Sequence, residues 1–268
     1  MRQVLGDLMG AQRLLREAWQ SSRAVVAASV KPGLHAKTVR LCDTDVVLEV
    51  EEFAAGGPVF VNLHENEQTS VAAARTVLEA SGGRLVCLRA KGQRYVIFWH
   101  GLRPHGFDPN RIFTDTGARQ TLARYSSLTP PALAALRQLR SDVLALLQAP
   151  PGQPVVALHN NSGTDYSVLH YQPGGRHAGD AAAVAVPALQ RPEDFFIVTD
   201  LRWFGHLESL GFNVVLQSPA ARDDGSLSVW FRQQGLSYIN VEARHGRQAE
   251  QEHMLRAVAG GLRPAAAY

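Results

Sequence analysis

The chain of 268 residues is 46% hydrophobic and 19% charged, a composition typical of a folded globular protein and not of a disordered one. A chain of this length can bury a substantial core. No apolar run approaches the roughly 20 residues that span a bilayer, so no membrane association is expected. The net charge of +3 is mild and the basic residues are scattered, so no nucleic-acid partner is expected.

The only two cysteines, Cys42 and Cys87, cannot form a disulfide framework. We interpret both as buried thiols, which favours a reducing compartment. A cytoplasmic location is therefore expected, with a periplasmic or secreted protein as the alternative. The oligomeric state is not indicated by any pattern in the sequence.

Hydrophobic periodicity and turn residues predict the elements in chain order. A helix is expected over 1–23, followed by a hairpin of strands over 37–42 and 46–50. Further strands are expected over 58–63, 84–89, 95–99, 154–158, 165–171, 195–199, 213–217, 227–231 and 237–243. Further helices are expected over 69–81, 116–126, 131–148, 201–210 and 249–262. The stretches 101–113 and 172–192 have the character of loops, and the second is long enough to be a lid or a binding loop.

Strands and helices alternate along most of the chain, which predicts an α/β fold with helices on both faces of the sheet. The expected hairpins add antiparallel members, so the sheet should be mixed and mostly parallel. No linker divides the chain. We therefore expect a single domain over 1–268, with an accessory helix and hairpin over about 1–50.

The segment 58–70 joins a buried strand to a helix through a polar cluster that contains His64 and Glu67. In α/β sheets, sites are built at this edge, beyond the carboxyl ends of the strands. A turn can bring the imidazole and the carboxylate to one side, as a zinc site requires. The alternative is that the two side chains only cap and solvate the turn, because short motifs recur by accident.

A second strand, over 154–158, also runs into a histidine, His159. If this strand lies parallel to 58–63 in one sheet, His64, Glu67 and His159 meet at one edge. Three nitrogen and oxygen ligands with one open position are typical of a catalytic zinc ion. Such an ion lowers the pKa of water and polarises a carbonyl.

Glu242 is the candidate general base, because it interrupts an otherwise apolar strand near its carboxyl end. A carboxylate there is costly unless it is paired or works near a metal. The alternative is an ion pair with Arg244 or another arginine.

The loop 101–113 supplies Arg103, Asn110 and Arg111. One arginine suits the oxyanion of a tetrahedral intermediate, and the other suits a substrate carboxylate that it grips in a bidentate manner. Asn110 can donate a hydrogen bond to the same carboxylate. The alternative is that these arginines are simply solvated.

Four motifs carry a resemblance to a known family: HENE at 64–67, DPNRIF at 108–113, LHNNSG at 158–163 and NVEA at 240–243. Their order resembles that of the zinc carboxypeptidase superfamily, and most closely its aspartoacylase and succinylglutamate desuccinylase branch. The resemblance implies that one zinc ion is bound by His64, Glu67 and His159, and that Glu242 promotes the water. It further implies that Asn110 and Arg111 hold the substrate carboxylate. It assigns the polarisation of the scissile carbonyl to Arg103, seven residues before Asn110.

The sequence thus predicts a zinc-dependent hydrolase that cleaves an amide bond in a small carboxylate-bearing substrate, either an N-acyl amino acid or a peptide. A carboxypeptidase or peptidoglycan-peptide amidase is the alternative within this class. A non-catalytic metal-binding or partner-binding module is the alternative from a different class.

Overall fold

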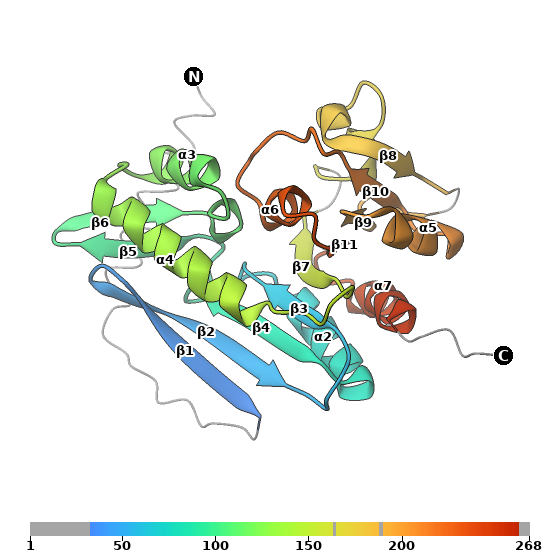
Figure 1. The fold of residues 1–268 in the computed structure, drawn as a ribbon, viewed down its shortest axis with the longest axis horizontal. Coiled ribbons are helices and arrows are strands. Elements are labelled where there is room, and N and C mark those ends of the chain that lie inside the picture. Colours follow the sequence, from blue (N-terminus) through green and yellow to red (C-terminus); the bar gives the residue numbers. More distant parts are fainter. Residues whose placement is uncertain (1–32, 163–164, 188–189, 263–268) are drawn as a thin grey trace.

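The computed structural model describes residues 33–162, 165–187 and 190–262, so the helix expected over 1–23 lies outside the described residues. Within these ranges nine strands form one sheet (Figure 1). In spatial order they are β1 (Leu34–Leu41), β2 (Thr44–Glu52), β4 (Arg84–Arg89), β3 (Val59–Asn62), β7 (Val155–Asn161), β11 (Tyr238–Arg244), β9 (Phe195–Val198), β10 (Val214–Gln217) and β8 (Ala181–Ala185). A separate hairpin consists of β5 (Val96–His100) and β6 (Arg103–Phe107).

The four central strands, β4, β3, β7 and β11, run parallel to one another. Antiparallel pairs lie on both sides of this centre, where β2 joins β4 and β9 joins β11. The expected mixed α/β sheet is thereby confirmed, including the parallel pairing of the two strands that precede His64 and His159. The expected hairpin near the amino terminus is the β1–β2 pair at one edge of the sheet.

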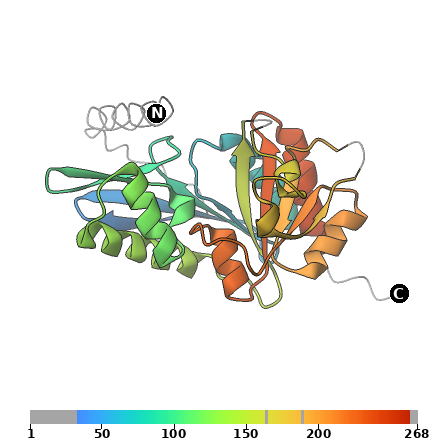
Figure 2. The same ribbon diagram turned by 90° about the horizontal axis from the view of Figure 1, so that it is seen from above.

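Helices cover both faces of the sheet (Figure 2). On one face lie α2 (Gln68–Ser81), α5 (Leu201–Ser209) and α7 (Gln248–Gly261). On the other face lie α3 (Asp115–Tyr125), α4 (Pro130–Leu146) and α6 (Leu227–Gln233). Short 3-10 turns are η1 (Pro109–Arg111), η2 (Val168–Tyr171) and η3 (Ala178–Asp180).

Two buried clusters hold these layers together, because successive residues of a strand point to opposite faces. On β3, Phe60 packs against the α2 side and Val61 against the α4 side, and both are fully buried. On β11, Ile239 and Val241 pack toward α2 and α7, so Glu242 points to the opposite face. That is also the face to which His159 of β7 points.

Local chemistry sets the helix ends. Thr129 caps α4 by accepting a hydrogen bond from the Ala132 N–H, and prolines follow in the first turn, where their missing N–H costs nothing. Gly82, at a φ of 72°, ends α2 and approaches the Ala54 carbonyl so closely that a Cβ would lie 2.5 Å from its oxygen.

Four expectations about secondary structure were wrong. The expected strand over 165–171 is a loop ending in η2, and the expected strand over 227–231 is α6. The expected loops over 101–113 and 172–192 contain β6 and β8, respectively. Ser226 explains the second error, because its hydroxyl accepts a hydrogen bond from the Val229 N–H and starts a helix.

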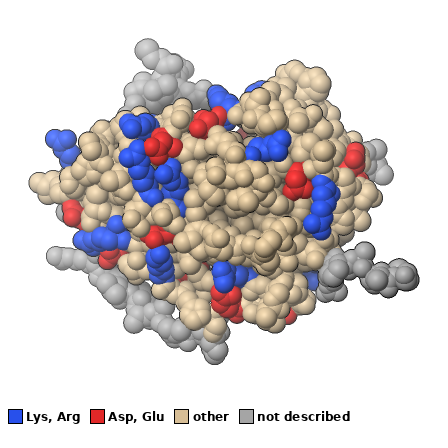
Figure 3. Space-filling view, viewed as in Figure 1, with Lys and Arg blue, Asp and Glu red and all other residues tan. Residues whose placement is uncertain are grey.

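Basic and acidic side chains are interspersed on the face shown in Figure 3, and basic ones gather over α3 and α4. Two of the latter, Arg137 and Arg140, pair with Asp115. None of the helices in the described ranges is both long enough and apolar enough to traverse a bilayer.

Candidate metal centre

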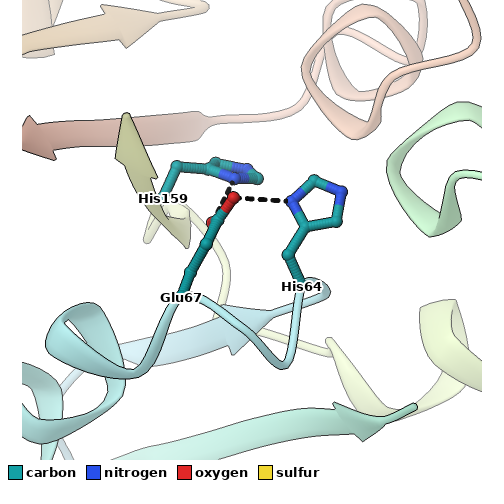
Figure 4. Close-up of side chains that lie close together, drawn as sticks. All are labelled: His64, Glu67 and His159. Atoms are coloured by element: carbon teal, nitrogen blue, oxygen red, sulfur yellow. Dashed lines mark hydrogen bonds and ion pairs between the residues drawn. The ribbon is translucent and has the colours of Figure 1, made fainter. Parts of the chain in front are cut away.

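The turn between β3 and α2 carries His64 and Glu67. It is closed by a hydrogen bond of 2.9 Å from the Glu67 N–H to the His64 carbonyl oxygen. The Ser70 hydroxyl donates to the Glu67 carbonyl oxygen at 2.7 Å, and Asn62 donates in turn to Ser70 Oγ at 3.3 Å. The turn is therefore fixed from inside the protein, and both side chains point to the same side (Figure 4).

His159 joins them from β7. Since β7 pairs in parallel with β3, its carboxyl end lies at the same edge of the sheet as the turn. His159 Nδ1 lies 3.1 Å from Glu67 Oε2, and His64 Nδ1 lies 3.1 Å from Glu67 Oε1. One ligand atom from each of the three residues lies within 4.8 Å of the others, and all three side chains are buried. The structure thus brings together the three residues expected to bind a metal.

His64 shows that this group suits a cation. Its Nε2 lies 2.8 Å from Asp108 Oδ1, an arrangement that fixes the tautomer and leaves Nδ1 free as a lone-pair donor. That Nδ1 atom is buried and makes no hydrogen bond, although the Glu67 oxygen is near. Two imidazole nitrogens and a carboxylate are ligands that zinc prefers, so the residues present fit the expected ion.

Both carboxylates are ionised at neutral pH. Burial acts to raise the pKa of Glu67, but the neighbouring His64 and His159 hold it well below its ordinary value. Burial likewise acts to raise the pKa of Asp108, which the hydrogen bond with His64 and the charge of Arg111 keep low. Glu67 is therefore in the form that binds a cation.

An open cavity of about 600 Å³ adjoins the three residues. Its wall includes Glu242, Asn110 and Arg111, three of the four other residues expected at the site. The fourth, Arg103, does not line it. Arg103 lies at the start of β6 with its side chain exposed, because the loop expected there is a strand of the outlying hairpin. Arg103, expected at the scissile carbonyl, therefore lies away from the residues that line the cavity.

Arg94 occupies the cavity wall instead. It lies in the short connection between β4 and β5, and its Nη1 is 2.6 Å from Glu67 Oε1. Its Nη2 is 3.9 Å from Asp108 Oδ2. Nothing in the local sequence distinguishes this residue from a solvated arginine in a turn, and only the folded chain brings it to Glu67.

Glu242 is buried, with 6% of its surface exposed. It lies opposite His159 in the β11–β7 pair and accepts a hydrogen bond of 3.2 Å from Asn240 Nδ2. Burial raises the pKa of Glu242 despite the nearby His159. In the described part of the chain Glu242 forms no ion pair, and the side chain of Arg244 is exposed. The alternative pairing with Arg244 is therefore absent there.

Asn110 and Arg111 belong to η1, which follows Asp108. Asn110 Oδ1 accepts a hydrogen bond of 3.1 Å from the Leu227 N–H, and its Nδ2 lies 3.4 Å from His159 Nε2. Arg111 donates to the Asn110 carbonyl oxygen at 2.7 Å, and its Nη2 lies 3.6 Å from Asp224 Oδ2. The two side chains therefore connect the three-residue group to the start of α6.

Two glycines allow the segment before α6 to lie close against η1. Gly225 has a φ of 78°, and a Cβ on it would lie 2.5 Å from the Arg111 carbonyl oxygen. A Cβ on Gly117 would lie 2.1 Å from Gly225 Cα. The segment before α6 can therefore rest directly on the backbone of η1.

A polar network behind the site was missed in the sequence. Asn160 accepts from the Ser70 N–H at 2.9 Å and donates to Gln251 Oε1 at 2.7 Å. Gln251 Nε2 donates to the His159 carbonyl oxygen at 3.0 Å. The motif at 158–163 contains Asn160, but no spacing links it to a glutamine on the last helix.

No protein-family model and no curated protein sequence matches the chain. Similar solved structures include the murein-tripeptide amidase MpaA from Escherichia coli O157, at 16% identity and a TM-score of 0.44, covering 89% of this chain and 94% of that one. Another is the ectoine utilization protein EutE (DoeB) from Ruegeria pomeroyi, at 15% identity and a TM-score of 0.42, covering 88% and 70%. A third is a succinylglutamate desuccinylase/aspartoacylase from Rhodobacter sphaeroides, at 12% identity and a TM-score of 0.40, covering 88% and 68%. At such identities these names assign neither a metal nor a substrate to the present chain.

Proposed function

We propose that this chain is a hydrolase of the zinc carboxypeptidase superfamily that cleaves an amide bond in a small carboxylate-bearing substrate. One observation carries the proposal: a buried group of two histidines and a glutamate opens onto the same cavity as the buried carboxylate of Glu242. A centre that only stabilised the fold would need neither the cavity nor the second carboxylate.

His64 Nδ1, the Glu67 carboxylate and His159 Nδ1 would hold one zinc ion. When bound there, zinc would supply a Lewis acid for the carbonyl and a lowered pKa for water. Asp108 orients His64 from behind through its hydrogen bond to Nε2. Gln251 holds the backbone of β7 at the His159 carbonyl oxygen, and Asn160 of β7 donates to the Ala243 carbonyl oxygen of β11.

Glu242 is proposed as the general base. Its carboxylate accepts a proton from the attacking water and passes it to the nitrogen of the leaving amine. Burial favours the first transfer, because a pKa above the ordinary value makes the carboxylate a stronger base. Asn240 holds one of its oxygens by a hydrogen bond and so limits its rotation.

The cavity arginines are proposed to stabilise negative charge. Arg94, rather than Arg103, would donate to the carbonyl oxygen as it becomes negative, because its guanidinium already lies beside Glu67. Arg111 and Asn110 would bind the substrate carboxylate, Arg111 through two parallel N–H groups. The substrate therefore carries a carboxylate a short distance from the scissile amide.

Metal analysis of the purified protein, combined with two substrate panels, tests this function. One panel contains N-acyl amino acids, and the other contains short peptides, including cell-wall peptides. We expect one equivalent of zinc, activity on one panel, and loss of both in His159→Ala. Activity on the peptides alone would indicate a carboxypeptidase or peptidoglycan-peptide amidase. Full metal occupancy with no activity on either panel would indicate a non-catalytic metal-binding module and would overturn the proposal.

A further inference from the structure

The wall of the cavity away from the three-residue group contains a buried amide without a complete set of partners. Gln217, the last residue of β10, is 6% exposed and lines the cavity. Its Nε2 donates to Ser228 Oγ at 3.3 Å, but its Oε1 is buried and accepts no hydrogen bond from the residues that the structure describes. A buried amide oxygen in that state is unfavourable unless a partner arrives.

Hydrogen bonds through α6 connect Gln217 to Asn110, which with Arg111 is proposed to bind the substrate carboxylate. Its partner Ser228 lies in the first turn of α6, beside Leu227, whose N–H donates to Asn110 Oδ1 at 3.1 Å. The first turn of α6 therefore contacts both Asn110 and Gln217. An amino acid held by its carboxylate at Asn110 and Arg111 therefore has Gln217 within reach of its side chain.

Next to β10, strand β9 presents an apolar side chain to the cavity. Ile197 of β9 lines the cavity, and it pairs with Asn240 of β11 on one side and with Val215 of β10 on the other. Gln217 follows Val215 by two residues. A substrate side chain that reaches Gln217 across β9 therefore passes the methyl groups of Ile197.

The carboxylates of the same wall already have partners. Asp224 Oδ2 lies 3.6 Å from Arg111, and Asp180 Oδ2 lies 3.2 Å from His177 Nδ1. Among the described residues that line the cavity, the amide oxygens of Gln217 and Asn240 are buried and accept no hydrogen bond. Asn240 is near Glu242 on β11, whereas Gln217 lies two strands away on β10, where an N–H donor on the substrate would satisfy its oxygen.

We infer that Gln217 selects the substrate: the amino acid that Asn110 and Arg111 hold by its carboxylate has an aliphatic side chain ending in an N–H donor, an amide or an ammonium group, which donates to Gln217 Oε1. This inference deepens the proposed function and rests on it. It makes Gln217 a specificity residue and gives it no part in the bond-breaking step.

Two matched pairs of substrates test the inference. Each substrate is an N-acyl amino acid or a dipeptide. In the first pair the carboxyl-bearing residue is glutamine or its near-isostere methionine, and in the second pair it is lysine or its deaminated analogue norleucine. Each residue is tested in its L and its D configuration. We expect the zinc-loaded enzyme to favour one N–H-bearing member over its apolar match in kcat/KM by roughly 10-fold to 100-fold, the ratio expected when an analogue leaves a buried acceptor unpaired. Comparing the two pairs shows whether the donor is an amide or an ammonium group.

Gln217→Met removes the acceptor at nearly constant volume, so it should bring the preferred ratio close to one while activity on the apolar match persists. Gln217→Glu keeps the acceptor and adds a negative charge, so it should retain a preference within the glutamine pair and increase the preference for lysine over norleucine. Thermal unfolding and zinc content show whether each variant is folded. An equal or greater kcat/KM for methionine and norleucine in the wild-type enzyme would overturn the inference, whatever the variants do.

Calorimetric titration with the four free amino acids separates this inference from the proposed function. If no substrate is hydrolysed but glutamine or lysine binds preferentially, and Gln217→Met removes the preference, the hydrolytic function fails and the selective site stands. If substrates are hydrolysed without a preference in either pair, the selective site fails and the hydrolase stands.

Discussion

Glu242 lies directly opposite His159 in the parallel pair formed by β11 and β7. Neighbouring strands are roughly 5 Å apart, and paired residues point to the same face of a sheet. The buried carboxylate is therefore held beside the buried imidazole by the register of two strands, without an ion pair of its own among the described residues.

The first prediction concerns this carboxylate. Glu242→Gln keeps the shape of the side chain and the hydrogen bond with Asn240 but removes the base. We expect kcat to fall by roughly 10²-fold to 10⁴-fold while the zinc content stays at the wild-type level. Glu208→Gln, on the exposed side of α5, is the control and should leave both unchanged. Turnover of Glu242→Gln at the wild-type rate would remove Glu242 from the mechanism.

The second prediction concerns the support of His64. Asp108→Asn weakens the hydrogen bond that orients the imidazole and removes a negative charge behind it. We expect zinc affinity to fall by roughly 10-fold to 100-fold, as measured by competition with a chromogenic chelator. Asp115→Asn removes an exposed carboxylate that pairs with Arg137 and should leave the affinity unchanged. Equal affinities for the two variants would show that Asp108 does not support the metal site.

The third prediction compares two arginines. Arg94→Met removes the guanidinium beside Glu67, and we expect kcat to fall by about 10²-fold to 10³-fold, the loss typical of one donor to a developing oxyanion. Arg103→Met should behave as the wild type because Arg103 is exposed on the hairpin. The reverse result in steady-state kinetics would restore Arg103 to the role that the sequence motif suggests.

The fourth prediction concerns the contact between Gly225 and η1. Gly225→Ala places a Cβ 2.5 Å from the Arg111 carbonyl oxygen at a φ of 78°, so the segment must move. We expect the free energy of unfolding to fall by about 1–3 kcal/mol and KM to rise, because Arg111 is displaced. Gly205→Ala is the control: Gly205 lies on α5 with nothing within 4 Å, so that variant should be slightly more stable. Unchanged denaturation and KM in Gly225→Ala would contradict the proposed packing.

The fifth prediction concerns the thiols. Burial raises the pKa of Cys87 to about 12, so its reactive thiolate is scarce at pH 8. We expect iodoacetamide to leave Cys87 unmodified in the native protein and to modify both cysteines in denaturant, as measured by peptide mass spectrometry. Rapid alkylation of Cys87 in the native state would show that this part of β4 opens readily.

The sequence predicted the central part of the fold because its signals are local there. The short apolar strands 58–63 and 154–158 each end in a polar cluster, and both features follow from burial on two faces of a parallel sheet. Their parallel pairing then brings His64 and His159 to the same edge. Repetition of one context at two places in the chain was thus enough to predict the convergence.

Positions set by distant packing were not predictable in this way. Arg94 lies in the connection between β4 and the β5–β6 hairpin, and its ion pair with Glu67 joins two segments far apart in the sequence. The β6 sequence contains Pro104 and Gly106, which suggest a loop, yet a two-stranded hairpin tolerates them. Residues 227–231 favour a strand by composition, whereas the cap at Ser226 decides for a helix. Because Val229 and Phe231 in this segment favour a strand, the capping serine was a weak signal for a helix.

The position of His159 within the chain has a consequence for biosynthesis. Glu67 and His159 are 92 residues apart, so the proposed zinc-binding group does not exist until β7 has docked against β3. Pairings at such separation form late, because a long loop must close first. In a nascent or misassembled chain only His64 and Glu67 would be close together, and two ligands bind an ion far more weakly than three do. Retention of the ion would then act as a mark of correct assembly and would distinguish finished molecules from immature ones.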